Sequence, residues 1–340
     1  MIKTQLLILL VTLTIAPLGL AQTTATARIT TGVLAISQKP ENRLAPVPVE
    51  NESITSYTFQ NTVKITHQCD LQESTAPITI LFALPNGNTT EQTFGRTKSD
   101  EIDWHYAIQH IGAQTRRLRE VLNSPVSTIY LEADTLSWPA RRKADSDATN
   151  TIVRLFTELE QKYAQPNDTV VLAAHSGGGS LIFGLLEAGP LPEWIDQILL
   201  LDASYNYQGN LHATPIMEWL AASADHRYTS IVYDERRVML NGKLLISPTG
   251  GTWRANERML SSIDGWTSQT ISSGPAGIDH WTRPNANVLN VHNPENAILH
   301  TVLVEKNGLV WGLLNALSLP AMEADQFFTT TEEGYRKWIR

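Results

Sequence analysis

The sequence predicts an α/β fold in which helices cover both faces of a mostly parallel central sheet. Three observations indicate it. Short continuous apolar runs recur along the chain, segments with helical spacing of apolar residues lie between them, and a glycine-rich turn follows the clearest run. Continuous apolar runs suit strands buried on both faces, and strands that alternate with helices favour a parallel sheet.

The expected strands share a β-branched and apolar composition. They cover residues 57–67 (as one strand or two), 77–84, 127–132, 169–174, 197–201, 228–233 and 288–291. The expected helices cover residues 100–122, 148–163, 178–186, 255–263 and 301–317. In the last helix Asn307-Gly308 is a turn signal that splits the segment or shifts its start. The stretch 235–287 is either a cap over a site or a plain insertion.

Composition and charge bound the class of protein. The 340 residues fit one domain of about 250–300 residues plus a leader. Hydrophobic residues make up 42% of the chain, enough to bury a large core. The formal net charge of −8 disfavours nucleic acid as a partner. Because Cys69 is the only cysteine, no internal disulfide can form.

The N-terminus has the pattern of an export signal. Lys3 precedes an apolar stretch over residues 6–20, and Gly19-Leu20-Ala21 offers small residues to a signal peptidase. We therefore expect a signal peptide over residues 1–21, cleaved after Ala21, and a secreted or periplasmic protein. The stretch is shorter than the roughly 20 residues of a membrane span. Residues 22–55 are expected to be irregular, and 56–340 to form one α/β domain.

A serine lies at a predicted strand-to-helix turn. The sequence Ala174-His175-Ser176-Gly177-Gly178 follows the strand expected over 169–174 and opens the helix expected over 178–186. A sharp turn of this kind strains the serine backbone, so its neighbours must be small. The turn lifts the hydroxyl out of the sheet, and the helix start directs backbone N–H groups at negative charge. These features predict Ser176 as a nucleophile and the Gly177 N–H as an oxyanion donor.

The same turn is open to two other interpretations. A glycine-rich turn can simply reverse the chain, and a phosphate-binding loop would need a lysine, which does not follow Gly179. With its flanking strand and helix, the chain resembles the α/β-hydrolases, the superfamily of esterases and lipases, over roughly residues 60–320. Ala174 stands where the family more often has glycine. The resemblance implies that 56–340 is a catalytic domain that needs no cofactor.

The resemblance also implies a second oxyanion donor in the loop after the strand over 77–84. That loop reads Pro85-Asn86-Gly87-Asn88-Thr89, with Asn86-Gly87 where the family often has His-Gly. The backbone of Asn88 is the predicted donor. Asn86 and Gly87, together with His175 beside the nucleophile, are predicted to contact substrate. An ordinary Asn-Gly turn is the alternative.

A serine hydroxyl needs a base, and the base needs a carboxylate to orient it. In the family the histidine comes last in chain order, which favours His300, with His292 as the competitor. Two carboxylates end predicted strands: Asp202 follows 197–201 and Asp234 follows 228–233. The resemblance favours Asp234, because the family usually places the acid after the later strand, although a minority of members use the earlier strand. The residues themselves favour Asp202: Asp234 begins a solvated charge cluster, whereas an Asp that ends an unbroken apolar run needs a partner. Asp202 is therefore the predicted acid, and Asp234 its alternative.

Together these residues predict a serine hydrolase that cleaves carboxylic esters through an acyl-enzyme, with a small-molecule or lipid-like ester as substrate. An amidase or peptidase would use the same residues, and a non-catalytic binding protein could retain the fold. No group of His, Cys, Asp and Glu has metal-ligand spacing in the sequence, so neither metal nor cofactor is expected. The oligomeric state has no signal in the sequence.

Overall fold

A computed structural model describes residues 44–72, 77–271, 277–316 and 338–339. The chain divides into two units, Met1–Leu44 and Ala45–Arg340, and every described helix and strand belongs to the second. The predicted signal peptide, most of the segment 22–55 and residue 317 of the last expected helix lie outside the described residues. Among the residues that are described, no helix has the length and apolar character that crossing a membrane requires.

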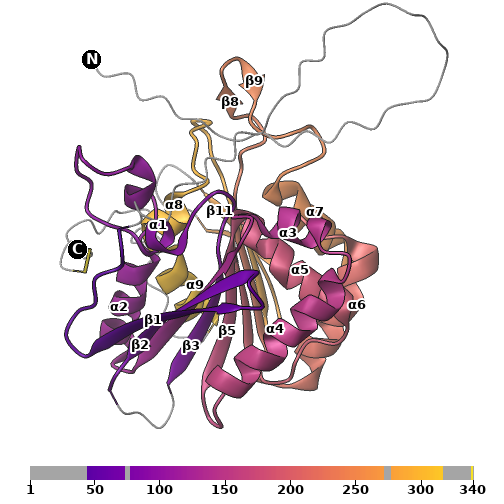
Figure 1. Cartoon of the computed structure of the whole chain (residues 1–340). Helices are drawn as coiled ribbons and strands as arrows, with labels where there is room; N and C mark the ends of the chain where they lie inside the picture. Colours follow the sequence, from indigo (N-terminus) through magenta and orange to yellow (C-terminus); the bar gives the residue numbers. More distant parts are fainter. Residues whose placement is uncertain (1–43, 73–76, 272–276, 317–337, 340) are drawn as a thin grey trace, which may run out of the picture. The chain divides into compact units, whose positions relative to one another are not determined.

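One mixed sheet of ten strands organises the described part of the second unit (Figure 1). Its order is β1-β2-β4-β3-β5-β6-β7-β12-β11-β10. Strands from β4 to β12 in this order pair parallel, whereas β1, β2, β11 and β10 join antiparallel at the two edges. The strands are β1 (Glu52–Phe59), β2 (Val63–Asp70), β3 (Ile78–Ala83), β4 (Val126–Ala133), β5 (Thr169–His175), β6 (Gln197–Leu201), β7 (Arg227–Tyr233), β10 (Thr267–Ile271), β11 (Ile278–Arg283) and β12 (Ala286–Val291).

Helices follow most of the parallel strands, and a small hairpin, β8 (Met239–Leu240) with β9 (Lys243–Leu244), stands apart from the sheet (Figure 1). The α-helices are α1 (Thr90–Phe94), α2 (Ile111–Leu122), α3 (Trp138–Ala144), α4 (Ala148–Tyr163), α5 (Gly179–Ala188), α6 (Gly209–Ala222), α7 (Thr252–Ser262), α8 (Val302–Glu305) and α9 (Gly308–Ala316). The residues that the structure describes also form the 3₁₀ helices η2 (Trp104–Ala107) and η3 (Ser176–Gly178).

The central strands are buried on both faces because a separate helical layer covers each face. In β5, Leu172 packs in the core that α4, α5, α6 and α7 share, whereas Val171 and Ala173 pack in the core that α2, α8 and α9 share. Figure 1 shows α4, α5 and α6 on one side of the sheet and α2 and α9 on the other. The two-sided burial explains the continuous apolar runs and confirms the predicted α/β fold.

Some predicted boundaries were wrong. The helix expected over 100–122 is two elements, η2 and α2, because His110 has non-helical backbone angles and its N–H donates to the carbonyl oxygen of Val304 at 2.9 Å. The segment 57–67 forms two strands, and the first begins at Glu52, within the segment expected to be irregular. The segment 301–317 divides at Asn307-Gly308, where the turn signal lies.

The stretch 235–287 extends the sheet. Its strands β10 and β11 pair antiparallel beside β12, and α7 packs on the face of β7 and β12. The sequence did not predict β10 and β11, because their polar side chains lack the apolar run that marks the central strands. The helices α1, α3 and α6 were missed as well. Pro215 inside α6 is a local signal against a helix that tertiary packing overrides.

A buried ion-pair network ties the first strand to the rest of the fold. The side chain of Glu52 is fully buried and accepts hydrogen bonds from Arg116 (2.5 Å), Arg119 (2.7 Å) and Gln68 (2.7 Å). Burial raises the pKa of Glu52, but the hydrogen bonds from Arg116 and Gln68 and the charges of Arg116 and Arg119 together outweigh burial and lower this pKa below its usual value. This carboxylate therefore joins β1, β2 and α2 in its ionised form.

We predict that Glu52→Ala lowers the free energy of unfolding by about 3–5 kcal/mol, because it leaves Arg116 buried without its counter-ion and leaves Arg119 with Asp70 alone. Urea denaturation followed by circular dichroism measures the loss. Glu50→Ala is the matched control, since Glu50 is exposed two residues away, and we expect it to change stability by less than about 0.5 kcal/mol. Equal losses in the two variants would contradict a structural role for the network.

Candidate active site

The turn between β5 and α5 carries Ser176. The residue lies between the strand and the helix that the sequence predicts, at the first position of η3. Its φ of 51° is in the left-handed region, which costs energy for a residue with a Cβ and which the surrounding structure must enforce. Such strain is typical of a side chain held for chemistry.

The first two glycines after Ser176 each allow a close approach of another part of the chain. A Cβ on Gly177 would lie 2.1 Å from Oδ1 of Asn86, and a Cβ on Gly178 would lie 2.2 Å from the carbonyl oxygen of Ala83. The first obstacle is the end of an exposed side chain, whereas the second is the backbone of β3. The turn therefore packs against β3 only because Gly178 lacks a side chain, while at Gly177 the neighbour has room to move.

His300 lies between Ser176 and Asp202. Its Nε2 is 2.8 Å from Oγ of Ser176, and its Nδ1 is 2.5 Å from Oδ2 of Asp202. The histidine follows β12 on the loop that leads into α8, and Asp202 directly follows β6. The side chain of His300 is 24% exposed and that of Asp202 is fully buried. The structure thus joins the predicted nucleophile, base and acid in one hydrogen-bonded chain.

Asp202 has a second partner. The hydroxyl of Thr252, in the first turn of α7, donates a hydrogen bond to its Oδ1. The two carboxylate oxygens thus accept from two different elements, and the charge is satisfied despite complete burial. Sequence reasoning missed Thr252, because nothing near it in the chain indicates that α7 begins against the end of β6.

The electrostatics of the site distinguish its two histidines. Burial lowers the pKa of His300, but the hydrogen bond to Asp202 and the charges of Asp202 and Glu235 raise it more, so the net pKa lies above the usual value. Burial and the neighbouring His300 hold the pKa of His175 well below its usual value. His175 therefore stays neutral, and its Nε2–H donates to the carbonyl oxygen of His300 at 2.8 Å.

The competing residues lie in other interactions. His292 pairs with Asp279, with Nε2 2.9 Å from the carboxylate. Asp234 accepts two hydrogen bonds from Arg236, at 2.8 and 2.9 Å. Burial raises the pKa of Asp234, but the hydrogen bonds and charge of Arg236 outweigh burial, so the net pKa lies below its usual value. This carboxylate is therefore ionised and paired. The structure does not bring either residue into the hydrogen-bonded chain around His300.

The predicted oxyanion loop lies beside the turn. The N–H of Gly177 is in the first turn of η3, where a helix start leaves donors without an intrahelical acceptor. In the loop, the N–H of Gly87 donates to the carbonyl oxygen of Leu136 at 2.7 Å and so is engaged. Asn88 donates its side-chain amide to the carbonyl oxygen of Asn86 at 3.1 Å. Asn86 is the loop residue whose side chain reaches Gly177.

Three residues at this site have side chains that can bind a metal ion. Asp202, Glu235 and His300 each offer a ligand atom, and these atoms lie within 4.8 Å of one another. Two ligands of one metal ion, each at about 2.0–2.2 Å from it, are separated by about 3 Å or more. The 2.5 Å between His300 Nδ1 and Asp202 Oδ2 is instead the length of a strong hydrogen bond. The geometry fits a shared proton better than a metal ion.

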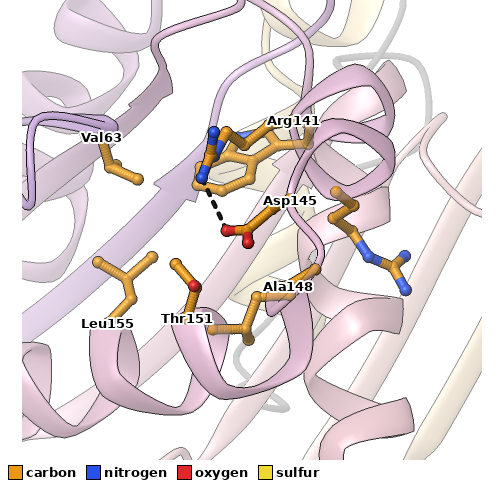
Figure 2. A pocket seen from close by; sticks show the side chains of 9 residues that line it. Val63, Arg141, Asp145, Ala148, Thr151 and Leu155 are labelled. Carbon is orange, nitrogen blue, oxygen red and sulfur yellow. Dashed lines mark hydrogen bonds and ion pairs between the residues drawn. The ribbon is translucent and has the colours of Figure 1, made fainter.

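A pocket between α3 and α4 contains none of the predicted site residues (Figure 2). Among its charged lining residues, Arg141 pairs with Asp145 at 2.7 Å and Arg142 pairs with Glu187 at 2.5 Å, and the lining also includes Val63 and Leu155. Because each of these charges already has a partner, we assign no function to this pocket, and Ser176 remains the centre of the candidate site.

Comparisons with known proteins find solved structures that are similar to this chain. No protein-family model and no curated protein sequence matches the chain. Similar solved structures include the peroxisomal alpha-beta-hydrolase Lpx1 from Saccharomyces cerevisiae (10% identity, 84% of this chain, 94% of that chain, TM-score 0.41). They also include the esterase Pf2001 from Pyrococcus furiosus (9%, 78%, 90%, 0.40) and the Cif epoxide hydrolase from Acinetobacter nosocomialis (14%, 48%, 43%, 0.28).

These similar structures are thus α/β-hydrolases, although the chain spans less than half of the epoxide hydrolase. At such identities and TM-scores the likeness carries no argument about function. Three features are observed in this structure and do not depend on the comparisons: the sheet order, the turn at Ser176, and the chain order Ser176, Asp202, His300. They agree with the resemblance noted in the sequence.

We predict opposite outcomes for alanine at the two adjacent glycines. Gly178→Ala should destabilise the protein by about 1–3 kcal/mol or more, because its methyl group meets the fixed backbone of β3. Gly177→Ala should cost less than about 1 kcal/mol, because the exposed side chain of Asn86 can rotate away. Thermal unfolding of the two variants measures the difference. Similar losses at both positions would show that the turn does not pack as described.

Proposed function

We propose that the chain is an exported serine hydrolase that cleaves carboxylic esters through an acyl-enzyme intermediate. One observation carries the proposal: a single imidazole, that of His300, lies 2.8 Å from the hydroxyl of Ser176 and 2.5 Å from the carboxylate of Asp202. A nucleophile, a base and an orienting acid in hydrogen-bond contact are what acyl transfer by serine requires. The left-handed backbone at Ser176 adds to this support.

In the proposed mechanism Nε2 of His300 accepts the hydroxyl proton as Oγ of Ser176 attacks the ester carbonyl carbon. Asp202 stays ionised, fixes the tautomer of the ring and stabilises the imidazolium. The imidazolium then protonates the leaving alkoxide, which departs and leaves the acyl group on Ser176. Water, deprotonated by the same imidazole, attacks the acyl-enzyme; the bond to Oγ then breaks, the imidazolium returns its proton to Oγ of Ser176, and the acid departs.

The oxyanion of each tetrahedral intermediate needs preorganised donors. Gly177 supplies one N–H in this proposal, because its amide lies at the helix start next to the nucleophile. The loop of Asn86 and Asn88 supplies the other, and Asn88 stays the predicted backbone donor. Asn86, Gly87 and His175 stay predicted substrate contacts. The contact between Asn86 and Gly177 favours the placement of the reacting carbonyl between the loop and the turn.

The proposed substrate is a small-molecule or lipid-like ester, and the proposed location is outside the cytoplasm. Export rests on residues 1–21 alone. A series of p-nitrophenyl esters of rising acyl length, with a p-nitroanilide of the best acyl group for comparison, tests the substrate class. Faster turnover of the anilide than of the ester would assign the site to an amidase.

We predict that a fluorophosphonate probe labels the intact protein and that Ser176→Ala abolishes the labelling, because the probe reacts with an activated serine hydroxyl. Fluorescence after gel electrophoresis and mass spectrometry of the labelled peptide measure it. Ser204→Ala, which changes a buried serine three residues after neighbouring β6, is the control that should retain labelling. Failure of the intact protein to react would remove the proposed nucleophile.

We predict that Asp202→Asn lowers kcat for the best ester by about 10³–10⁴-fold, because an amide cannot stabilise the imidazolium and favours the wrong tautomer. Asp234→Asn should change kcat by less than about threefold, because Asp234 pairs with Arg236 away from His300. Steady-state kinetics on the two variants side by side measure this. The reverse ranking would assign the acid to Asp234.

A further inference from the structure

Glu235 is a buried carboxylate next to the hydrogen-bonded chain that the mechanism above does not use. It is the second residue after β7, and it is only 5% exposed. Its neighbour Asp234 pairs with Arg236, whereas a carboxylate oxygen of Glu235 lies within 4.8 Å of ligand atoms of both Asp202 and His300. Two carboxylates thus face one imidazole from the ends of two neighbouring strands, β6 and β7.

Glu235 also holds the backbone that carries His300. Its Oε1 accepts a hydrogen bond from the N–H of Leu299 at 3.0 Å. The other side of the same segment is held by His175, whose Nε2–H donates to the carbonyl oxygen of His300 at 2.8 Å. The segment 292–301 contains no helix or strand, so these two contacts contribute, next to His300 itself, to the positioning that regular structure would otherwise provide.

The surroundings of Glu235 make its charge effective. The titratable groups that face it are Asp202, His300, Tyr205 and Tyr233. Burial and the charges of Asp202 and Glu235 raise the pKa of both tyrosines, so the tyrosines stay neutral. Burial and the charge of Asp202 likewise raise the pKa of Glu235 to about 6. At pH values above that pKa, the negative charges of Asp202 and Glu235 therefore lie close to each other and to the imidazole of His300. Because both carboxylates are buried, little water screens these charges.

We propose that Glu235 is a positioning residue for His300: it fixes the loop through the N–H of Leu299 and adds a second negative charge beside the imidazolium that forms in acyl transfer. This role rests on the proposed serine hydrolase function. Like charges at Asp202 and Glu235 repel each other while His300 is neutral. When His300 takes the proton from Ser176, its positive charge relieves that repulsion, so the pair stabilises the transition state more than the ground state.

Two substitutions separate the charge from the hydrogen bond. Glu235→Gln keeps a carbonyl oxygen for the N–H of Leu299 but removes the charge, and Glu235→Ala removes both. We expect the proton affinity of His300 to fall by roughly tenfold in Glu235→Gln, about one pKa unit. The acid limb of the kcat/KM profile should move to lower pH by the same amount. In Glu235→Ala we expect the same shift and, in addition, a kcat about tenfold or more below that of Glu235→Gln, because the loop that carries His300 loses the hydrogen bond to Leu299.

The readouts are a ¹⁵N NMR titration of His300, assigned with His300→Asn, and pH profiles of kcat and KM. Asp234→Asn is the matched control, one residue away with its carboxylate on Arg236, and it should leave both readouts unchanged. Glu235→Gln is expected to remain folded even where Glu235→Ala is not. An unchanged titration of His300 in Glu235→Gln would overturn the inference.

The NMR titration keeps this inference distinct from the proposed function. A wild-type protein that neither reacts with fluorophosphonate nor cleaves esters would sink the function, and with it the role of Glu235 in acyl transfer. A wild-type protein that is active, combined with an unshifted His300 in Glu235→Gln, would sink the inference alone. The inference is supported if the wild type is active and if, in Glu235→Gln, the pKa of His300 is lowered and the acid limb of the kcat/KM profile moves to lower pH by the same amount.

Discussion

The candidate site depends on the register between two neighbouring parallel strands. His175, the last residue of β5, pairs with Leu201, the last residue of β6. Ser176 and Asp202 therefore leave the sheet side by side, and both do so with a left-handed backbone, at φ of 51° and 47°. A slip of one residue would turn one of the two side chains toward the other face. Every later step, from the imidazole to the second carboxylate, requires these two turns to coincide.

Both turns are unfavourable locally and are maintained by packing around them. The core strands on either side are fully buried, so the backbone at their ends has few alternatives. At Ser176 the close approach of β3 to Gly178 fixes the path of the chain. At Asp202 a fully buried carboxylate would be costly alone, but Thr252 and His300 each satisfy one oxygen. The fold thus supplies the energy that keeps the reactive groups in strained and desolvated positions.

The sequence was sufficient for the parts of the site that have a local pattern. The central strands and the turn at Ser176 could be predicted because burial on both faces and the need for small residues leave a signal in consecutive residues. The preference for Asp202 over Asp234 followed from the apolar run that precedes it, and the Arg236 pair explains why Asp234 is turned away. The edge strands β10 and β11 left no such signal, because their polar side chains read as loop.

Thr252 and Glu235 could not be predicted because their roles arise only when distant segments meet. Thr252 reaches Asp202 from 50 residues away, since α7 packs against β7 and β12 with its first turn at the end of β6. Glu235 is buried and accepts from the N–H of Leu299, 64 residues away, whereas Asp234, one residue earlier, pairs with Arg236. Three adjacent parallel strands, β5, β6 and β7, therefore each deliver one group to the same imidazole: a hydroxyl, a hydrogen-bonded carboxylate and a second negative charge. Because carboxyl ends of parallel strands share one edge of a sheet, this convergence is a property of the architecture, and the side chains at those ends decide how basic His300 becomes.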